Sequence, residues 1–128
     1  MSGPLKALVV DDSRVIRRIV GNSLRALQVE VYEADNGRTA LETLNRVPGI
    51  GFILLDWNMP VMDGIQCLRV LRADVRFKDV RVCMVTSESE MAGVVLALNE
   101  GANEYLMKPF GPEALQEKLQ MLMGAIEQ

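Results

Sequence analysis

Histidine is absent from this sequence of 128 residues, and cysteine occurs only twice. The absence of histidine excludes Ser-His and Cys-His nucleophiles and removes the usual zinc ligand. Cys67 and Cys83 lie in apolar segments and form no metal-ligand cluster, which predicts buried, reduced thiols. Chemistry in this chain must therefore use carboxylates, lysine, hydroxyl groups or a bound ion.

The sequence also lacks long hydrophobic runs and an excess of positive charge. No stretch of about 18 apolar residues is present to span a bilayer, and the first residues do not follow a signal-peptide pattern. A net charge of −3 means that the chain has no excess of basic residues to attract the phosphate groups of a nucleic acid. Since linkers, repeats and low-complexity tracts are absent too, we expect one cytoplasmic domain over residues 1–128. It should have no output domain, no nucleic-acid partner and no membrane insertion.

Short apolar segments alternate along the chain with longer segments of helical period. A βα unit repeated five times with short connections favours an α/β fold, namely a doubly wound parallel sheet with helices on both faces, in three layers. The second strand alternates in hydropathy, as expected at the edge of a sheet. The predicted strands are residues 5–10, 29–34, 52–55, 80–85 and 104–107.

Apolar stripes and capping residues locate the helices between these strands. The first helix should bury a stripe of Val15, Ile16, Ile19, Val20, Leu24 and Leu27, and the fifth a stripe of Leu115, Leu119, Leu122 and Ile126. Asn36 is suited to cap the second helix, and Asp63 with Gln66 forms a capping box for the third. Gly101 suits the left-handed position that closes the fourth helix, and Pro112 suits the first turn of the fifth.

Polar side chains follow four of the predicted strands, at the edge where a parallel sheet binds ligands. Each alone has a structural explanation as a helix cap, a turn residue or a surface charge. Their joint placement is harder to explain in that way, because three acidic groups brought together repel one another and lose solvation. The residues are Asp11-Asp12, Asp56, Thr86-Ser87 and Lys108-Pro109.

A cation is the expected compensation for these three carboxylates. Oxygen ligands without histidine or thiolate favour Mg²⁺, with Mn²⁺ as the alternative. A hard cation beside an aspartate, a lysine and a threonine hydroxyl makes up a set of groups suited to phosphoryl transfer. The sequence therefore predicts that Asp56 accepts a phosphoryl group, with Lys108 and Thr86 assisting.

The motifs in which these residues stand resemble the receiver domains of two-component response regulators, and within that family the single-domain chemotaxis regulators. The resemblance covers essentially the whole chain and implies a flavodoxin-like (βα)₅ fold with strand order 2-1-3-4-5. It is carried by Asp11-Asp12-Ser13, Asp56-Trp57-Asn58-Met59-Pro60, Met62-Asp63-Gly64, Thr86-Ser87-Glu88 and Lys108-Pro109-Phe110.

The resemblance also implies roles for individual residues. Asp56 would become the 4-aspartylphosphate, taking its phosphoryl group from the phosphohistidine of a sensor histidine kinase. Asp12, Asp56 and the backbone carbonyl of Asn58 would ligate Mg²⁺, with Asp11 acting through a bound water. Lys108 would pair with the phosphoryl oxygens, and the peptide bond that follows Lys108 is expected to be cis.

Signalling would follow from a change in packing. Thr86 would move towards the phosphoryl group, and Tyr105 would turn into the space that Thr86 leaves. This would alter the face formed by the fourth helix, the fifth strand and the fifth helix. Asn58 and Glu88 match the residue types of fast-turnover chemotaxis regulators, so we expect a short-lived phosphoryl group, with a possible external phosphatase. Apart from this self-phosphorylation and autodephosphorylation, the chain should not be an enzyme.

The downstream partner is less well specified by the sequence. Residues 89–92, at the expected start of the fourth helix, are acidic and apolar where the flagellar-motor regulator carries basic residues, although Lys118 on the fifth helix keeps one positive charge. A chemotaxis target such as the flagellar motor switch and a target in another phosphorelay therefore both stay open. A monomer and a phosphorylation-dependent dimer would use the same face.

Other classes of protein fit less well. A haloacid-dehalogenase-like, Mg-dependent phosphatase places an Asp-x-Asp motif after its first strand, where this chain has Asp11-Asp12-Ser13, and it would need a cap domain. A flavin carrier of the same fold needs a Ser/Thr/Gly-rich phosphate loop at that point. A receiver that signals without phosphorylation usually loses an acidic residue or the lysine, whereas this chain keeps the full set.

Overall fold

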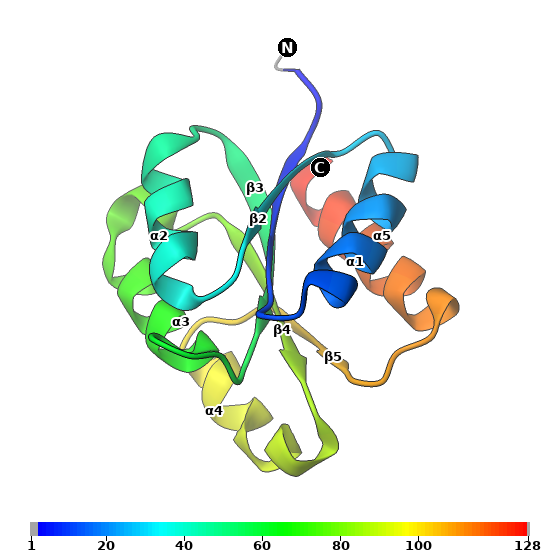
Figure 1. Cartoon of the computed structure of the whole chain (residues 1–128). Coiled ribbons are helices and arrows are strands. Elements are labelled where there is room, and N and C mark those ends of the chain that lie inside the picture. Colours follow the sequence, from blue (N-terminus) through cyan, green and yellow to red (C-terminus); the bar gives the residue numbers. More distant parts are fainter. Residues whose placement is uncertain (1–2, 128) are drawn as a thin grey trace.

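Five parallel strands form the central sheet of the molecule (Figure 1). The computed structural model describes residues 3–127, apart from the side chains of residues 88 and 127. The strands lie in the order β2-β1-β3-β4-β5 and neighbouring strands are parallel, which confirms the order implied by the resemblance. They are β1 (Lys6–Val10), β2 (Glu30–Ala34), β3 (Ile50–Asp56), β4 (Arg81–Thr86) and β5 (Glu104–Met107).

Helices cover both faces of the sheet, so the molecule has the three predicted layers. α1 and α5 lie on one side, and α2, α3 and α4 on the other (Figure 1). Two short 3₁₀ segments, η1 (Val75–Phe77) and η2 (Glu88–Gly93), precede β4 and α4. The helices are α1 (Arg14–Ala26), α2 (Gly37–Arg46), α3 (Gly64–Ala73), α4 (Val94–Asn99) and α5 (Pro112–Glu127).

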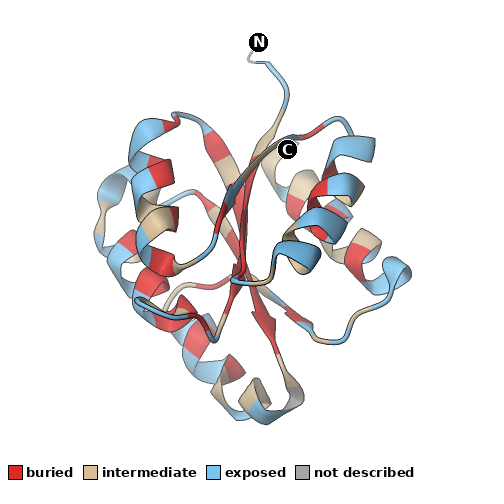
Figure 2. Ribbon diagram, in the orientation of Figure 1, coloured by how far each residue is buried: buried red, intermediate tan, exposed pale blue. Residues whose placement is uncertain are grey.

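Two hydrophobic cores hold these layers together, because successive residues of a strand point to opposite faces. In β1, Leu8 and Val10 pack into the core beneath α2, α3 and α4, whereas Ala7 and Val9 pack into the core beneath α1 and α5. Figure 2 shows the buried residues on the sheet and on the helix faces turned towards it. Burial on both faces fixes the strands so that their carboxyl ends meet at one edge.

The predicted helix ends are confirmed. The side chain of Asn36 accepts a hydrogen bond from the backbone N–H of Thr39 at 3.0 Å and caps α2. Asp63 and Gln66 form the capping box of α3. Gly101 follows α4 with φ of +113°, a conformation that glycine adopts without strain, and α5 begins at Pro112.

Two expectations about the helices were wrong. Val15 and Ile19 were placed in the buried stripe of α1 but are 66% and 47% exposed, because the helix turns only Val20 and Leu24 of that stripe fully to the core. The fourth helix is interrupted as well. Residues Glu88–Gly93 form the 3₁₀ segment η2, and only Val94–Asn99 are α-helical.

The boundaries of β1 to β4 differ from the predicted ones by one or two residues, and those of β5 agree. β3 begins at Ile50 rather than at residue 52, since Ile50 is itself buried and pairs with Lys6 of β1. Both cysteines are free and buried, as expected. Among residues 3–127, no helix has the length and hydropathy needed to cross a bilayer.

Candidate functional site

Three aspartates meet at the carboxyl edge of the sheet. Asp11 and Asp12 follow β1, and Asp56 is the last residue of β3, the neighbouring strand. One carboxylate oxygen from each lies within 4.8 Å of the others. Asp11 and Asp56 are almost completely buried, whereas Asp12 is exposed. The arrangement offers a cluster of oxygen ligands, open to solvent on the side of Asp12, that suits a hard divalent cation.

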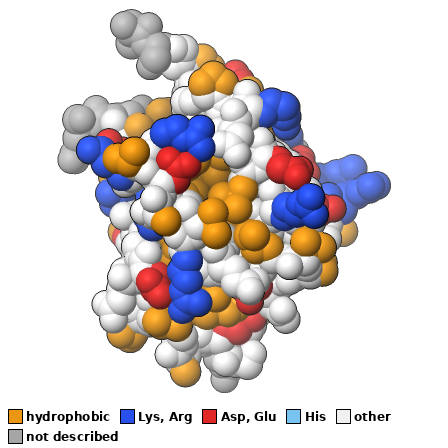
Figure 3. Space-filling model, turned by 90° about the vertical axis from the view of Figure 1, so that its left-hand side faces the viewer, with side chains coloured by type: hydrophobic (Ala, Val, Ile, Leu, Met, Phe, Trp, Pro, Cys, Tyr) orange, Lys and Arg blue, Asp and Glu red, His pale blue; other side chains and the backbone are white. Residues whose placement is uncertain are grey.

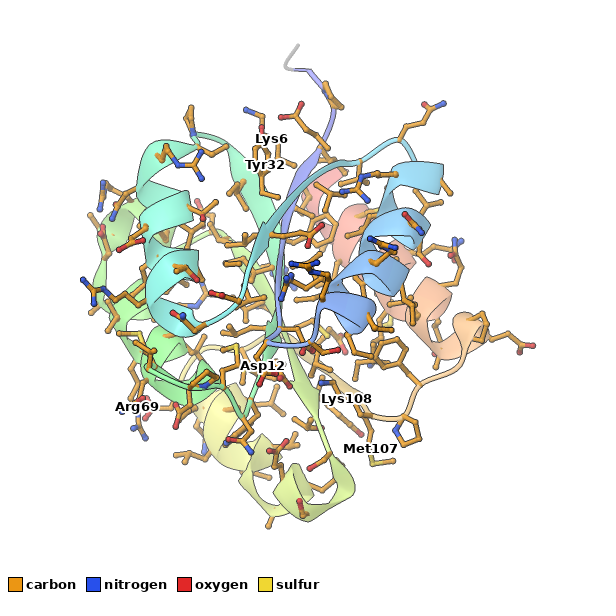
Figure 4. All side chains as sticks on the ribbon, viewed as in Figure 1. Lys6, Asp12, Tyr32, Arg69, Met107 and Lys108 are labelled. Carbon is orange, nitrogen blue, oxygen red and sulfur yellow. The ribbon has the colours of Figure 1, made fainter. Side chains whose placement is uncertain are left out.

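Lys108 reaches this cluster from the end of β5. Its Nζ lies 2.8 Å from Oδ2 of Asp11 and 3.2 Å from Oδ1 of Asp56. The backbone positions this side chain, because the Lys108 N–H donates to the carbonyl of Thr86 at 2.6 Å and the Lys108–Pro109 peptide bond is cis. Figure 4 shows Lys108 and Asp12 at the same end of the sheet. The cis bond expected from the resemblance is therefore present.

The electrostatics of the cluster are unbalanced. Burial, together with the charge of Asp11, raises the pKa of Asp56 from 3.8 to about 6, although Lys108 acts in the opposite direction. Burial alone would lower the pKa of Lys108, but its contacts with the two carboxylates raise that pKa above its usual value. One lysine facing three carboxylates leaves an excess of negative charge, which a bound cation would compensate.

The turn after β3 holds the acceptor carboxylate in place. The N–H of Gly64 donates to the carbonyl of Trp57 at 2.8 Å, and a Cβ at Gly64 would overlap the carbonyl of Asp56. Val61 has φ of +69°, an unfavourable conformation for a β-branched residue, which the tight turn between Pro60 and Met62 imposes. Backbone contacts therefore fix this segment closely. Asn58 lies on its exposed part.

The two residues expected to switch lie on neighbouring strands. Thr86 is fully buried, and its hydroxyl contacts Sδ of Met91 at 3.7 Å. The Tyr105 side chain is 37% exposed, with Nζ of Lys118 5.2 Å from the centre of its ring. Lys118 in turn pairs with Glu104 at 2.8 Å. In this structure the hydroxyl of Thr86 therefore points to the sulfur of Met91, and the ring of Tyr105 lies at the surface.

The structure brings Asp11, Asp12, Asp56 and Lys108 together, as the sequence predicted. Thr86 adjoins them through its backbone bond to Lys108. The side chain of Glu88, expected to tune the phosphoryl lifetime, lies outside the described residues. The roles given to these residues stay predictions, because geometry alone does not test them.

Sequence reasoning missed two residues that support the site. Arg17 donates to the backbone carbonyl of Asp11 at 2.6 Å and pairs with Glu33 at 2.9 Å, which ties the end of β1 to α1 and β2. Arg17 stands one helical turn after Ser13, close to the end of β1, so the sequence could have indicated this contact. Met91, the sulfur partner of Thr86, had no such signal, because the 3₁₀ segment that carries it was expected to be α-helical.

Comparisons with known proteins agree with this geometry. The family described as the response regulator receiver domain matches residues 7–120. Chemotaxis protein CheY1 of Helicobacter pylori is 44% identical, over 94% of this chain and 98% of that protein. Chemotaxis protein CheY of Pseudomonas aeruginosa is 43% identical, over 95% of this chain and 98% of that protein.

Solved structures show the same fold. Chemotaxis response regulator CheY4 of Vibrio cholerae has a TM-score of 0.86 and 34% identity, over 94% of this chain and 99% of its own. A probable two-component system response regulator/GGDEF domain protein has a TM-score of 0.89 and 35% identity over 97% of this chain, which spans only 51% of that longer protein.

Receiver domains of this kind are signalling modules rather than true enzymes, and they bind Mg²⁺ at an acidic pocket such as the cluster of Asp11, Asp12 and Asp56. The sequence match, the strand order and the cluster at the carboxyl edge agree. The chain belongs to the receiver-domain family of two-component response regulators and is CheY-like.

Proposed function

We propose that this chain is a chemotaxis-type response regulator in which Asp56 is the phosphoryl acceptor. The observation that carries the proposal is the contact of Lys108 with both Asp56 and Asp11 inside a cluster of three carboxylates. The curated relatives named as chemotaxis proteins support the choice of pathway. A phosphorelay outside chemotaxis is the alternative that keeps the same chemistry.

The chemistry is the transfer of a phosphoryl group from a kinase phosphohistidine to a carboxylate. An oxygen of Asp56 attacks the phosphorus atom, the P–N bond breaks, and the electron pair stays on the imidazole nitrogen. Lys108 offsets the charge of the phosphoryl oxygens. Asp12, Asp56 and the carbonyl of Asn58 would hold Mg²⁺, with Asp11 acting through a water, and the ion would neutralise those oxygens when bound.

A change at Thr86 and Tyr105 would transmit the signal. The new phosphoryl oxygens are strong acceptors, so the Thr86 hydroxyl would leave Met91 and donate to them. Tyr105, now 37% exposed, would turn into the vacated space. Asn58 and Glu88 flank the predicted path of the attacking water and would set the lifetime of the phosphoryl group.

The partner would bind the face formed by α4, β5 and α5. Several hydrophobic side chains of α4 and β5 are exposed there, and they offer apolar contact rather than the positive charge of the flagellar-motor regulator. A downstream protein, such as a motor switch component, would therefore have to present a complementary apolar surface. The exposed residues are Val95, Leu96, Leu98 and Met107.

Intact-mass measurement after incubation with acetyl phosphate and Mg²⁺ tests the proposal. We expect the gain of one phosphoryl group, and we expect none for Asp56→Asn. Lys108→Ala should still be modified but should lose the change in partner binding. A wild-type chain that gains no phosphoryl group, or an Asp56→Asn chain modified equally, would contradict the proposal. Multiple turnovers on small phosphate esters would instead support a phosphatase.

A further inference from the structure

A hollow of about 520 Å³ lies at the end of the sheet opposite the aspartates. The first residues of β3 and β4 line it, together with the end of α2, the segment η1 and the end of α5. Because the strands are parallel, this is the amino edge of the sheet, the end where Figure 4 shows Lys6 and Tyr32 and from which Asp12 and Lys108 are remote. The hollow is therefore separate from the phosphorylation site.

Apolar and polar groups contribute equally to the walls of this hollow. The apolar part comes from three elements and the residues beside them, namely Leu44 of α2, Val47 directly after α2, Phe77 of η1, Val80 directly before β4, and Ile126 of α5. Gly51 packs closely against α5, because a Cβ at this position would lie only 3.3 Å from the Cδ1 of Ile126. Figure 3, which faces the side that carries α2 and α3, shows hydrophobic side chains gathered between basic and acidic ones. A volume of this size and lining suits a small organic ligand.

Arg81 lines the hollow and carries one buried nitrogen without a partner. Its Nε is buried and has no hydrogen-bond acceptor. Its guanidinium makes no hydrogen bond or ion pair with the other residues whose side chains the structure describes. Buried donors in folded proteins are nearly always paired, so an orphan of this kind calls for an explanation. A small rotation of the guanidinium towards the hollow would present its planar fork to an acceptor there.

The other charges around the hollow limit the kind of ligand. Arg76 is already occupied, since Nη2 lies 2.6 Å from Asp74 and 2.8 Å from Asn45. Asp79 adds a negative charge at the exposed rim. Lys6 adds a positive charge, since its Nζ donates to the carbonyl of Pro48 at 3.0 Å beside Gly49. The two cations Lys6 and Arg81 facing one rim carboxylate leave a single positive charge, which suits a monoanion better than a phosphate dianion. Burial and the nearby charge of Arg81 also lower the pKa of Arg72, so an anion would relieve repulsion between these two arginines.

We propose that this hollow binds a small monocarboxylate with an apolar ring, whose carboxylate pairs with Arg81. The ring lies against Val47, Phe77 and Ile126, and the carboxylate receives the hydrogen bonds that the Arg81 fork lacks. Arg81 begins β4, and Thr86 ends it, so the ligand site and the predicted switch share one strand. Binding itself does not depend on phosphorylation of Asp56.

The test is an NMR titration of the full-length chain with 1-naphthylacetate and, as the matched neutral probe, 1-naphthylacetamide. We expect saturable shifts at the amides of Gly49, Gly51 and Arg81 with the carboxylate, and at least roughly tenfold weaker binding of the amide. Arg81→Met should weaken binding of the carboxylate by a similar factor. Arg69→Met, which removes an exposed guanidinium of α3, should leave the titration unchanged.

Three results would overturn the proposal. No saturable shift up to about 10 mM probe would show that there is no site. Equal binding of the acid and the amide, or of wild type and Arg81→Met, would show an adventitious additive only. Shifts confined to the aspartate edge would place the anion elsewhere. Since the Nε of Arg81 is unpaired, Arg81→Met should keep the wild-type melting temperature, which confirms that the variant folds.

Discussion

At the scale of single residues, the most consequential feature is the buried carboxylate of Asp56. Its pKa of about 6 in the folded chain lies above the ordinary value of 3.8, first because of burial and then because of Asp11. A raised pKa means that the folded state binds the proton more tightly than the unfolded state does. Without a cation, the stability associated with this proton is complete below about pH 4 and is lost as the pH rises through 6.

Asp56→Asn should therefore stabilise the metal-free protein at neutral pH. A pKa rise from 3.8 to about 6 corresponds to roughly 3 kcal/mol, so we expect a gain of about 1–3 kcal/mol above pH 7 and little gain at pH 4. Urea unfolding of both chains across this pH range measures the difference. A gain that is independent of pH would show that ionisation of Asp56 is not its cause.

Met91 offers a second prediction at this scale, because it holds the hydroxyl of Thr86 away from the acceptor. Met91→Leu keeps the apolar volume but removes the sulfur acceptor, so Thr86 would be freer to reach a phosphoryl group. The contact is weak, at about 0.5–1 kcal/mol, and we expect the phosphorylated fraction at limiting acetyl phosphate to rise by about two- to fivefold.

Intact mass measures that fraction, and Met121→Leu is the matched control. Met121 is an exposed methionine of α5, so its replacement should leave phosphorylation unchanged. A phosphorylated fraction in Met91→Leu equal to or below that of wild type would show that the thioether does not restrain Thr86.

At the scale of helices and strands, hydrophobic period and capping chemistry predicted the elements and their order. β5 and the first residues of α2, α3 and α5 agree with the sequence, because local groups such as Asn36 and Asp63 define them. The exposure of Val15 and Ile19 was not predictable, since the pattern of α1 allows several apolar faces and only tertiary packing selects one. Neither was η2, because a short 3₁₀ segment has no sequence period that separates it from the first turns of an α-helix.

The candidate site was more predictable than the helices that surround it. Strand order and parallel direction alone bring Asp11, Asp56 and Lys108 to one edge, whatever the details of packing. The supporting contacts of Arg17 and Met91 depend on side-chain directions, which the sequence does not encode in a simple period.

Arg72 joins several elements at once. From α3 it donates to the carbonyls of Gly101, Phe77 and Val80 and to the side chain of Asn103, at distances of 2.6–3.1 Å. Arg72→Met would leave these acceptors without their charged donor. We expect a loss of about 2–4 kcal/mol in the free energy of unfolding, measured with urea.

Arg69→Met provides the comparison on the same helix. Arg69 forms an exposed ion pair with Glu100 at 2.8 Å, which should contribute less than about 1 kcal/mol. Equal losses in the two variants would show that the hydrogen bonds from Arg72 to the segment between α4 and β5 do not contribute more than an exposed ion pair.

At the scale of the whole molecule, the sheet joins two cores, and each of its edges carries its own unbalanced charge. The carboxyl edge has three carboxylates facing one lysine, and the amino edge has Arg81, whose buried Nε has no acceptor among the residues that the structure describes. Alternate residues of β1, β3 and β4 enter the two cores, so the charge imbalance at either edge acts on the same sheet. A ligand that neutralises the excess charge at one edge should therefore stabilise the entire fold.

Mg²⁺ should therefore raise the melting temperature of the whole chain. A ligand present at 100 times its dissociation constant stabilises a protein by about 2.7 kcal/mol, which corresponds to a rise of several degrees for a domain of this size. Removal of the ion with EDTA should reverse the rise. Asp12→Asn and Asp56→Asn should each lose most of the rise in melting temperature, and Asp56→Asn should start from a higher metal-free melting temperature.

NaCl at matched ionic strength separates binding from screening, because screening would raise the melting temperatures of all three chains alike. If Mg²⁺ and NaCl changed the melting temperatures of all three chains equally, the three carboxylates would lie close together without binding the ion.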